Sequence, residues 1–105
     1  MDHRPKTPEQ YVNLIDQALF EIDDLRAAAE YDMESMGDVL DFLDQLERDV
    51  HALKQSMIEG RYQFGKTDLP FMRIVEEQSD RVLPFKYLLR MINATHRLGL
   101  DVEPE

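Results

Sequence analysis

Apolar side chains recur every three or four residues through the first half of the chain, and this period constrains what that half can form. The first run consists of Ile15, Leu19, Ile22, Leu25 and Ala29. Such spacing places the side chains on one face of an α-helix, whereas a half-buried strand alternates at every second residue. Thr7, Pro8 and Gln10 are typical of a helix start with a capping box. The sequence therefore predicts a helix over Pro8–Met33.

A second apolar run continues almost the same stripe. It consists of Met33, Met36, Leu40, Leu43, Leu46, Val50, Leu53 and Met57. Gly37 weakens a helix interior, and Ser35 or Asp38 could cap a new helix. One helix over 8–59 would be about 75 Å long, which a domain of this size could cover only with a partner. We expect a break between Ser35 and Asp38 and a second helix over Asp38–Glu59, with a continuous rod in a dimer as the alternative.

The tripeptide Leu-Pro-Phe occurs twice, at 69–71 and again at 83–85. Proline suits the first turn of a helix, because its φ is fixed and its missing N–H is not needed there. Asp68 and Asp80 precede the two copies and are expected to cap. Each copy is predicted to start a helix and to anchor that start in the core through its Leu and Phe. The alternative is one helix kinked at Pro84.

The last helix is expected over Pro84–Leu98, with Gly99 as its end. Gly60 is expected to end the preceding long helix and to open a loop over 60–68, whose aromatic residues pack on the bundle. The last helix is apolar over a wide arc, with Tyr87, Met91 and Leu98 beside its main apolar side. Such an arc is typical of a central buried helix or of a second, exposed interface.

Composition favours helix over sheet, since Gly is scarce, at 4 residues, and β-branched residues are few. We predict an all-α small helical bundle in one domain over residues 1–105, with frayed ends near 1–6 and 101–105. Its elements are two long antiparallel helices plus one kinked or two short C-terminal helices. The predicted core consists of Ile15, Leu19, Ile22, Leu25, Leu40, Leu43, Leu46, Val50, Leu53, Phe71, Val75, Phe85, Leu89 and Ile92.

The net charge of −10 is carried by one half of the chain. Residues 1–50 hold 14 acids and 4 bases, and residues 51–105 hold 8 of each. Such a surface repels phosphate backbones and anionic membranes, so neither nucleic acid nor membrane is an expected partner. The absence of Cys excludes disulfides and thiolate metal sites, and no run is long enough to span a bilayer. We expect a soluble, cytoplasmic protein without a cofactor.

Two residue pairs could carry chemistry. Glu47 and His51 lie one helical turn apart, which is one spacing that can present two metal ligands, but no second copy accompanies it. Arg90 followed by His96 resembles the signature of HEPN-type ribonucleases, which are helical domains of about this length. That resemblance implies RNA cleavage by Arg90 and His96. Glycine-rich phosphate loops and metalloprotease motifs are absent from the sequence.

The stretches EIDDLRAAAEYDM (21–33) and LPFKYLLRMINATHRLGLD (83–101) resemble short uncharacterised bacterial proteins. Those proteins are loosely labelled as general secretion pathway, GspF-like. The resemblance implies a bacterial protein and supplies no functional residues.

The favoured function is a non-catalytic protein-interaction, regulatory or accessory protein, present as a homodimer. Its acidic N-terminal half would bind a protein partner with a basic surface. The candidate partner-binding residues are an acidic ridge and four exposed aromatic residues: Glu9, Asp16, Asp23, Glu30, Phe20, Phe42, Tyr62 and Tyr87. The alternatives are the helical ribonuclease and an acidic mimic of nucleic acid.

Overall fold

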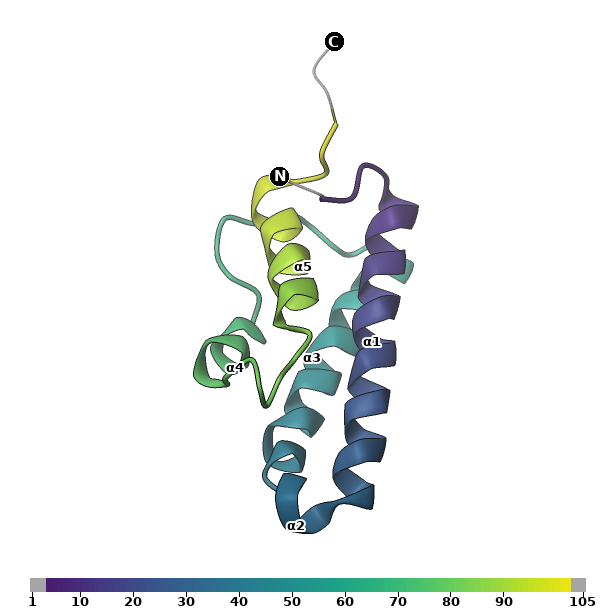
Figure 1. Cartoon of the computed structure of the whole chain (residues 1–105). Coiled ribbons are helices and arrows are strands. Elements are labelled where there is room, and N and C mark those ends of the chain that lie inside the picture. Colours follow the sequence, from purple (N-terminus) through teal and green to yellow (C-terminus); the bar gives the residue numbers. More distant parts are fainter. Residues whose placement is uncertain (1–3, 103–105) are drawn as a thin grey trace.

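The computed structural model describes residues 4–102, and every regular element there is a helix (Figure 1). The helices are α1 (Pro8–Tyr31), α2 (Met33–Met36), α3 (Val39–Ile58), α4 (Met72–Glu77) and α5 (Lys86–Leu98). α1 and α3 lie side by side and run in opposite directions, α5 packs against α1, and α4 packs against α5. The predicted all-α bundle is therefore confirmed. Of the frayed ends predicted near 1–6 and 101–105, residues 1–3 and 103–105 lie outside the described residues.

The capping residues predicted for the first helix act at its start. The N–H of Gln10 donates to Thr7 Oγ1 at 3.1 Å, and the Gln10 side chain accepts from the N–H of Lys6 at 2.8 Å. The helix ends at Tyr31 instead of the predicted Met33, because the next residue, Asp32, has a φ of −121° and a ψ of 63°, which are not helical. α2 then forms a short turn before α3 begins at Val39. The non-helical backbone therefore lies at Asp32, three residues before the predicted break between Ser35 and Asp38, where Gly37 and Asp38 keep helical backbone angles. The chain reverses here, and the continuous rod does not form.

The core forms where α1, α3 and α5 meet and includes residues from the loops around α4. Of the predicted core residues, all are buried except Leu19 and Leu40, which are partly buried and pack against the core. The helical period predicted these positions well, because each helix buries one continuous stripe.

Both Leu-Pro-Phe copies lie immediately before a helix and anchor it. Leu69 and Phe71 are buried before α4, Leu83 and Phe85 are buried before α5, and both prolines are exposed. The chain is extended at Gln78, with φ −98° and ψ 145°, so two short helices form instead of one kinked helix.

The two expected aspartate caps do not form. Phe71 and Phe85 occupy the N-cap positions, and neither α4 nor α5 has a side-chain cap hydrogen bond. The reason is that the tripeptide itself makes the turn, which separates Asp68 and Asp80 from the first helical turn.

Glycine ends both α3 and α5, as the sequence predicts. Gly60 has a φ of 73° and Gly99 a φ of 86°, a backbone region that favours glycine. After Gly60, the N–H of Arg61 donates to the carbonyl of Ser56 at 2.8 Å, which closes a Schellman motif. The loop over 60–68 therefore leaves α3 in a fixed direction and returns along the end of α5.

Candidate functional site

The outer surface of α1 carries the predicted acidic ridge. Glu9, Asp16, Asp23 and Glu30 are all exposed. A seven-residue step drifts by only about 20° around a straight helix, so the four side chains follow one line. Lys54 on α3 reaches this line, with its Nζ 2.7 Å from Asp16 Oδ1. The ridge is therefore partly neutralised beside α3.

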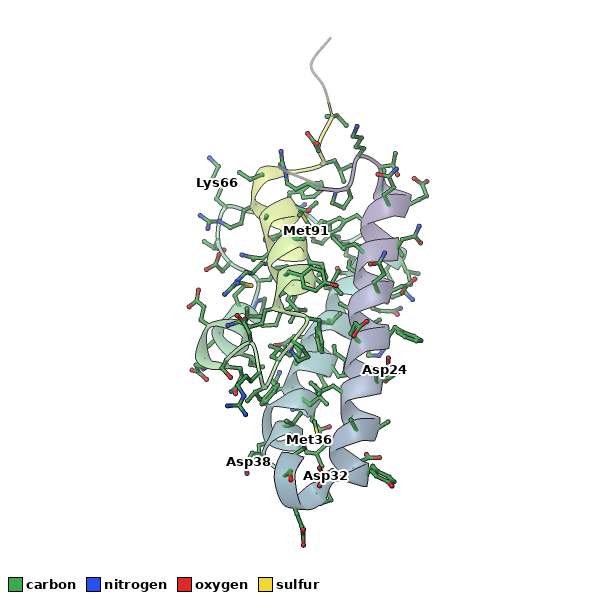
Figure 2. The ribbon with its side chains drawn as sticks, in the orientation of Figure 1. Asp24, Asp32, Met36, Asp38, Lys66 and Met91 are labelled. Carbon is green, nitrogen blue, oxygen red and sulfur yellow. The ribbon has the colours of Figure 1, made fainter. Side chains whose placement is uncertain are left out.

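Two aromatic side chains on α1 are exposed, and one of them has carboxylates as its helical neighbours. Phe20 is 64% exposed and Tyr31 is 94% exposed. Asp23 and Asp24 follow Phe20 by three and four residues, which makes them its neighbours on the helix surface. Asp24 lies on the side of α1 that is turned away from α5 (Figure 2). We call Phe20, Asp23, Asp24 and Tyr31 the α1 face.

The base within α1, Arg26, is directed toward α3. One guanidinium nitrogen lies 2.7 Å from Asp44 Oδ1, and the other lies 3.1 Å from Glu47 Oε1. The hydrogen bond to Asp44 raises the pKa of Arg26. Glu47 is thereby held by Arg26, while His51 is exposed. Within residues 4–102, no group of three or more His, Asp or Glu side chains is placed to hold a metal ion.

Tyr62 lies in a chain of hydrogen bonds between the loop, α1 and α5. Tyr11 Oη donates to the carbonyl of Ile92 at 3.0 Å and lies 3.2 Å from Tyr62 Oη, which is 2.7 Å from His96 Nδ1. The single hydroxyl proton of Tyr11 is used in the bond to Ile92. The contact between the two tyrosines is therefore a hydrogen bond only if the Tyr62 hydroxyl donates to Tyr11 Oη. His96 then donates from Nδ1 to Tyr62, which assigns the tautomer of the neutral ring.

Packing around this chain fixes the loop over 60–68 against the bundle. Phe64 stacks on Tyr11 at 6.1 Å and meets Tyr62 edge-on at 5.2 Å. Burial raises the pKa of Tyr11 and of Tyr62 and lowers the pKa of His96, so the neutral forms are favoured. A Cβ at Gly65 would lie only 3.0 Å from His96 Nε2. These aromatic residues therefore hold the loop in place.

Arg90 and His96 do not meet in one site within the chain. Their separation of six residues turns them about 120° apart around α5. Arg90 is exposed and lines a cavity near α4, whereas His96 is bonded to Tyr62 on another side of the helix. The Arg–His pair implied by the ribonuclease resemblance is thus not assembled by this fold alone.

A cavity of about 760 Å³ opens between α4, α5 and the loop before α4. It is lined by Lys66, Asp68, Met72, Glu76, Arg90, Asn93, Ala94, Arg97 and Leu98. Asn93 Nδ2 donates to Asp68 Oδ1 at 2.9 Å, and Asn93 Oδ1 accepts from the N–H of Leu69 at 2.8 Å. Arg97 lies 3.3 Å from the same oxygen of Asp68. This network holds the loop to α5 and forms one wall of the cavity.

The remaining candidate aromatic residues differ in their exposure. Phe42 is partly buried against the core, while Tyr87 is 68% exposed on α5. Sequence reasoning missed the buried polar residues Lys86, Asn93 and Thr95. Lys86 Nζ donates to the carbonyl of Gln78 at 2.6 Å, and no short-range pattern in the sequence could have indicated this contact.

Two stretches carry the resemblance to short bacterial proteins. The first, residues 21–33, covers the second half of α1 and the start of α2, and the second, residues 83–101, covers α5 with its flanking turns. Within residues 4–102, no helix is both long and apolar enough to cross a membrane. Comparisons with protein-family models, with curated proteins and with solved structures each find no match.

Proposed function

We propose that this chain is a non-catalytic interaction domain that binds a basic protein surface through the α1 face. The observation that carries the proposal is the exposure of two aromatic rings, Phe20 at 64% and Tyr31 at 94%, on a helix surface rich in carboxylates. Aromatic residues dominate the energy of many protein interfaces, because a large rigid ring is desolvated at little entropic cost.

The charge of α1 supports a basic partner. Its sequence contains six acidic residues and one base, and that base, Arg26, is bound to Asp44 and Glu47 on α3. The carboxylates on the outer side of α1 therefore keep most of their negative electrostatic potential. Such a field raises the association rate with a basic surface and disfavours acidic competitors.

The spacing of the carboxylates favours a protein partner over mimicry of nucleic acid. α1 has 24 residues, which at a rise of about 1.5 Å per residue gives a length of about 36 Å. Six carboxylates over that length are about 6 Å apart along the axis, against about 3.4 Å per phosphate along one strand of DNA. The carboxylates of α1 are therefore spaced too widely to match a phosphate backbone well. Their spacing suits an ordinary acidic protein interface better.

The test is affinity capture from a cell lysate with quantitative mass spectrometry of the bound proteins. Phe20→Ala is the test variant, and Ile58→Ala is the control, because Ile58 on α3 has a nearly equal exposed fraction of 63%. We expect at least one basic protein to be lost by Phe20→Ala and retained by Ile58→Ala. A set of bound proteins that is the same for both variants would refute the proposal.

A charge variant completes the design. Asp23→Lys combined with Asp24→Lys should remove the same protein, and raising the salt concentration should weaken its binding to the unchanged chain. Asp16 is left unchanged, because its substitution would also break the ion pair with Lys54 and so disturb the fold.

A further inference from the structure

Three basic side chains line one cavity beside α5. The cavity between α4, α5 and the loop before α4 has a volume of about 760 Å³, and its walls include Lys66, Arg90 and Arg97. The chain has 12 lysines and arginines against 22 acids, so a quarter of its bases gather at this place. α5, which supplies two of the three, contains no acidic residue. The cavity therefore differs in charge from the acidic outer surface of α1.

Two of these basic side chains are available to a ligand. Both Arg90 and Lys66 are exposed, and within residues 4–102 neither side chain forms an ion pair or a hydrogen bond. The guanidinium of Arg97, in contrast, lies 3.3 Å from Asp68 Oδ1 and donates to the carbonyl of Lys66 at 3.2 Å. An anion that enters the cavity can therefore bind two cations without breaking an existing ion pair.

The walls of the cavity are held in place by bonds of the chain itself. Arg97 ties the backbone of Lys66 to α5, and Asn93 ties Asp68 and the N–H of Leu69 to the same helix. A ligand then has to order only the free side chains of the wall. Binding to such a preorganised site costs less conformational entropy than binding to a mobile loop.

The charges of the wall indicate the charge of the ligand. Arg97 neutralises Asp68, which leaves Arg90 and Lys66 against Glu76 on α4, two positive charges against one negative charge. A singly charged carboxylate balances this excess, whereas a phosphate ester, with a charge of about −1.5 to −2 at pH 7, exceeds it. The planar guanidinium of arginine also matches a carboxylate with two parallel hydrogen bonds.

The remaining part of the wall is apolar and lies next to Arg90. Met72, Ala94 and Leu98 line this part, and Leu98 is 68% exposed. Ala94 and Leu98 follow Arg90 by four and eight residues, so they lie on the same side of α5. A carboxylate at Arg90 can thus place an attached apolar group over the small side chain of Ala94 and against Leu98. The volume falls within the range of about 300–1,000 Å³ that is usual for organic ligands.

The acidic residues of α1 do not face this cavity. Figure 1 shows α4 on one side of α5 and α1 on the other, and in Figure 2 Lys66 and Asp24 lie on opposite sides of the molecule. A helix with its side chains is about 10–12 Å across. This exceeds the Debye length of about 8 Å at physiological ionic strength, so salt largely screens the repulsion between the outer carboxylates of α1 and an anion in the cavity.

We propose that the cavity between α4 and α5 binds an apolar organic acid, with its carboxylate on Arg90 and Lys66 and its apolar body against Ala94 and Leu98. This goes beyond the proposed function and does not rest on it, because the α1 face lies on the other side of the molecule. Phe20→Ala should therefore leave the binding of the acid unchanged.

Titration of the isotope-labelled chain with benzoate at pH 7, followed by heteronuclear NMR, tests the site. Benzoate joins a carboxylate to an apolar ring, whereas acetate lacks the ring, benzyl alcohol lacks the charge and phenyl phosphate carries more charge. We expect benzoate to shift the amide resonances of Ala94 and Leu98 saturably and to bind more tightly than the other three compounds. No saturable shift at these amides, or equally tight binding of any of the other three, would overturn the proposal.

Four variants separate the cavity from the general charge of the surface. Arg90→Gln should raise the dissociation constant of benzoate by about 5-fold or more, and Glu76→Gln should lower it by about 2- to 5-fold. Arg73→Gln and Glu77→Gln are the matched controls, because both residues are exposed on α4 and do not line the cavity. Neither control should change the dissociation constant.

The result that contradicts the site is also defined by these pairs. Equal weakening by Arg90→Gln and Arg73→Gln would mean that benzoate responds only to net charge, and weaker binding to Glu76→Gln would mean that the ligand donates a hydrogen bond to Glu76. Either outcome would overturn the proposal. The side chains of Arg90 and Glu76 are exposed, so both variants should fold, and the NMR spectrum of each free variant checks this.

Discussion

Replacing Asn93 with Ala should loosen the loop before α4 from α5. Asn93 is buried, at 7% exposure, and it joins two segments that are 24 residues apart. Its Oδ1 accepts the N–H of Leu69 at 2.8 Å, and its Nδ2 donates to Asp68 at 2.9 Å. Ala offers neither group, so the buried N–H of Leu69 loses its partner.

The magnitude follows from these two bonds. A buried donor without a partner costs about 1–3 kcal/mol. The bond to Asp68 adds about 1 kcal/mol, below the range of about 1.5–3 kcal/mol for a bond to a charged group, because that carboxylate is half exposed and water can replace the amide. We therefore expect Asn93→Ala to lower the free energy of unfolding by about 2–4 kcal/mol, out of about 5–15 kcal/mol for a typical domain.

Two measurements check this expectation. Urea denaturation gives the change in the free energy of unfolding, and amide hydrogen exchange reports the protection of the Leu69 N–H. Asn13→Ala, at an exposed position on α1, is the control and should change stability by less than about 0.5 kcal/mol. If the Leu69 amide stays as protected in Asn93→Ala as in the unchanged chain, the buried bond does not hold the loop and the reasoning fails.

Three further predictions follow. Leu43→Ala should cost about 2–5 kcal/mol by chemical denaturation, because Leu43 is fully buried, and an unchanged melting temperature would count against this core. Burial lowers the pKa of His96 in the folded chain. Below a pH of about 6.5, His96 therefore binds a proton more readily in the unfolded chain than in the folded chain. The free energy of unfolding should consequently fall as the pH drops below that value. His96→Gln should reduce that fall, whereas His51→Gln at an exposed position should not; equal pH profiles would contradict the assignment. Gly60→Ala should cost about 1–2 kcal/mol from its positive φ alone, since space around it is open, and a thermal melt would measure this.

The helices could be predicted from the sequence because their signals are local. The apolar period in α1 and α3 repeats at each turn, and the capping residues around Thr7 lie within a few positions of the bonds that they form. The second Leu-Pro-Phe copy needed a choice between a new helix and a kink, and the extended backbone at Gln78 decides it. Pattern alone could not make this choice, since the apolar phase is compatible with both.

The candidate site was less predictable, because its contacts join distant segments. Tyr62 and His96 are 34 residues apart in the sequence, and neither residue type indicates that the other will be its hydrogen-bond partner. Asn93 is buried and His96 is partly buried in a hydrogen-bond chain, and no local pattern in the sequence indicates either contact. The exposure of the acidic ridge was easier to predict, because the charged side of a helix lies opposite its buried apolar stripe.

The contact between the two ends of the described chain has a consequence for its connectivity. The N–H of Asp101 donates to the carbonyl of Pro5 at 2.8 Å, so the backbone nearly closes into a ring. A short linker across this contact and a new opening at the turn around Gly37 would give a circular permutant with the same packing but with α1 and α3 no longer adjacent in sequence. Folding of that permutant would reveal whether the bundle depends on forming the α1–α3 hairpin first or only on the final burial of its core.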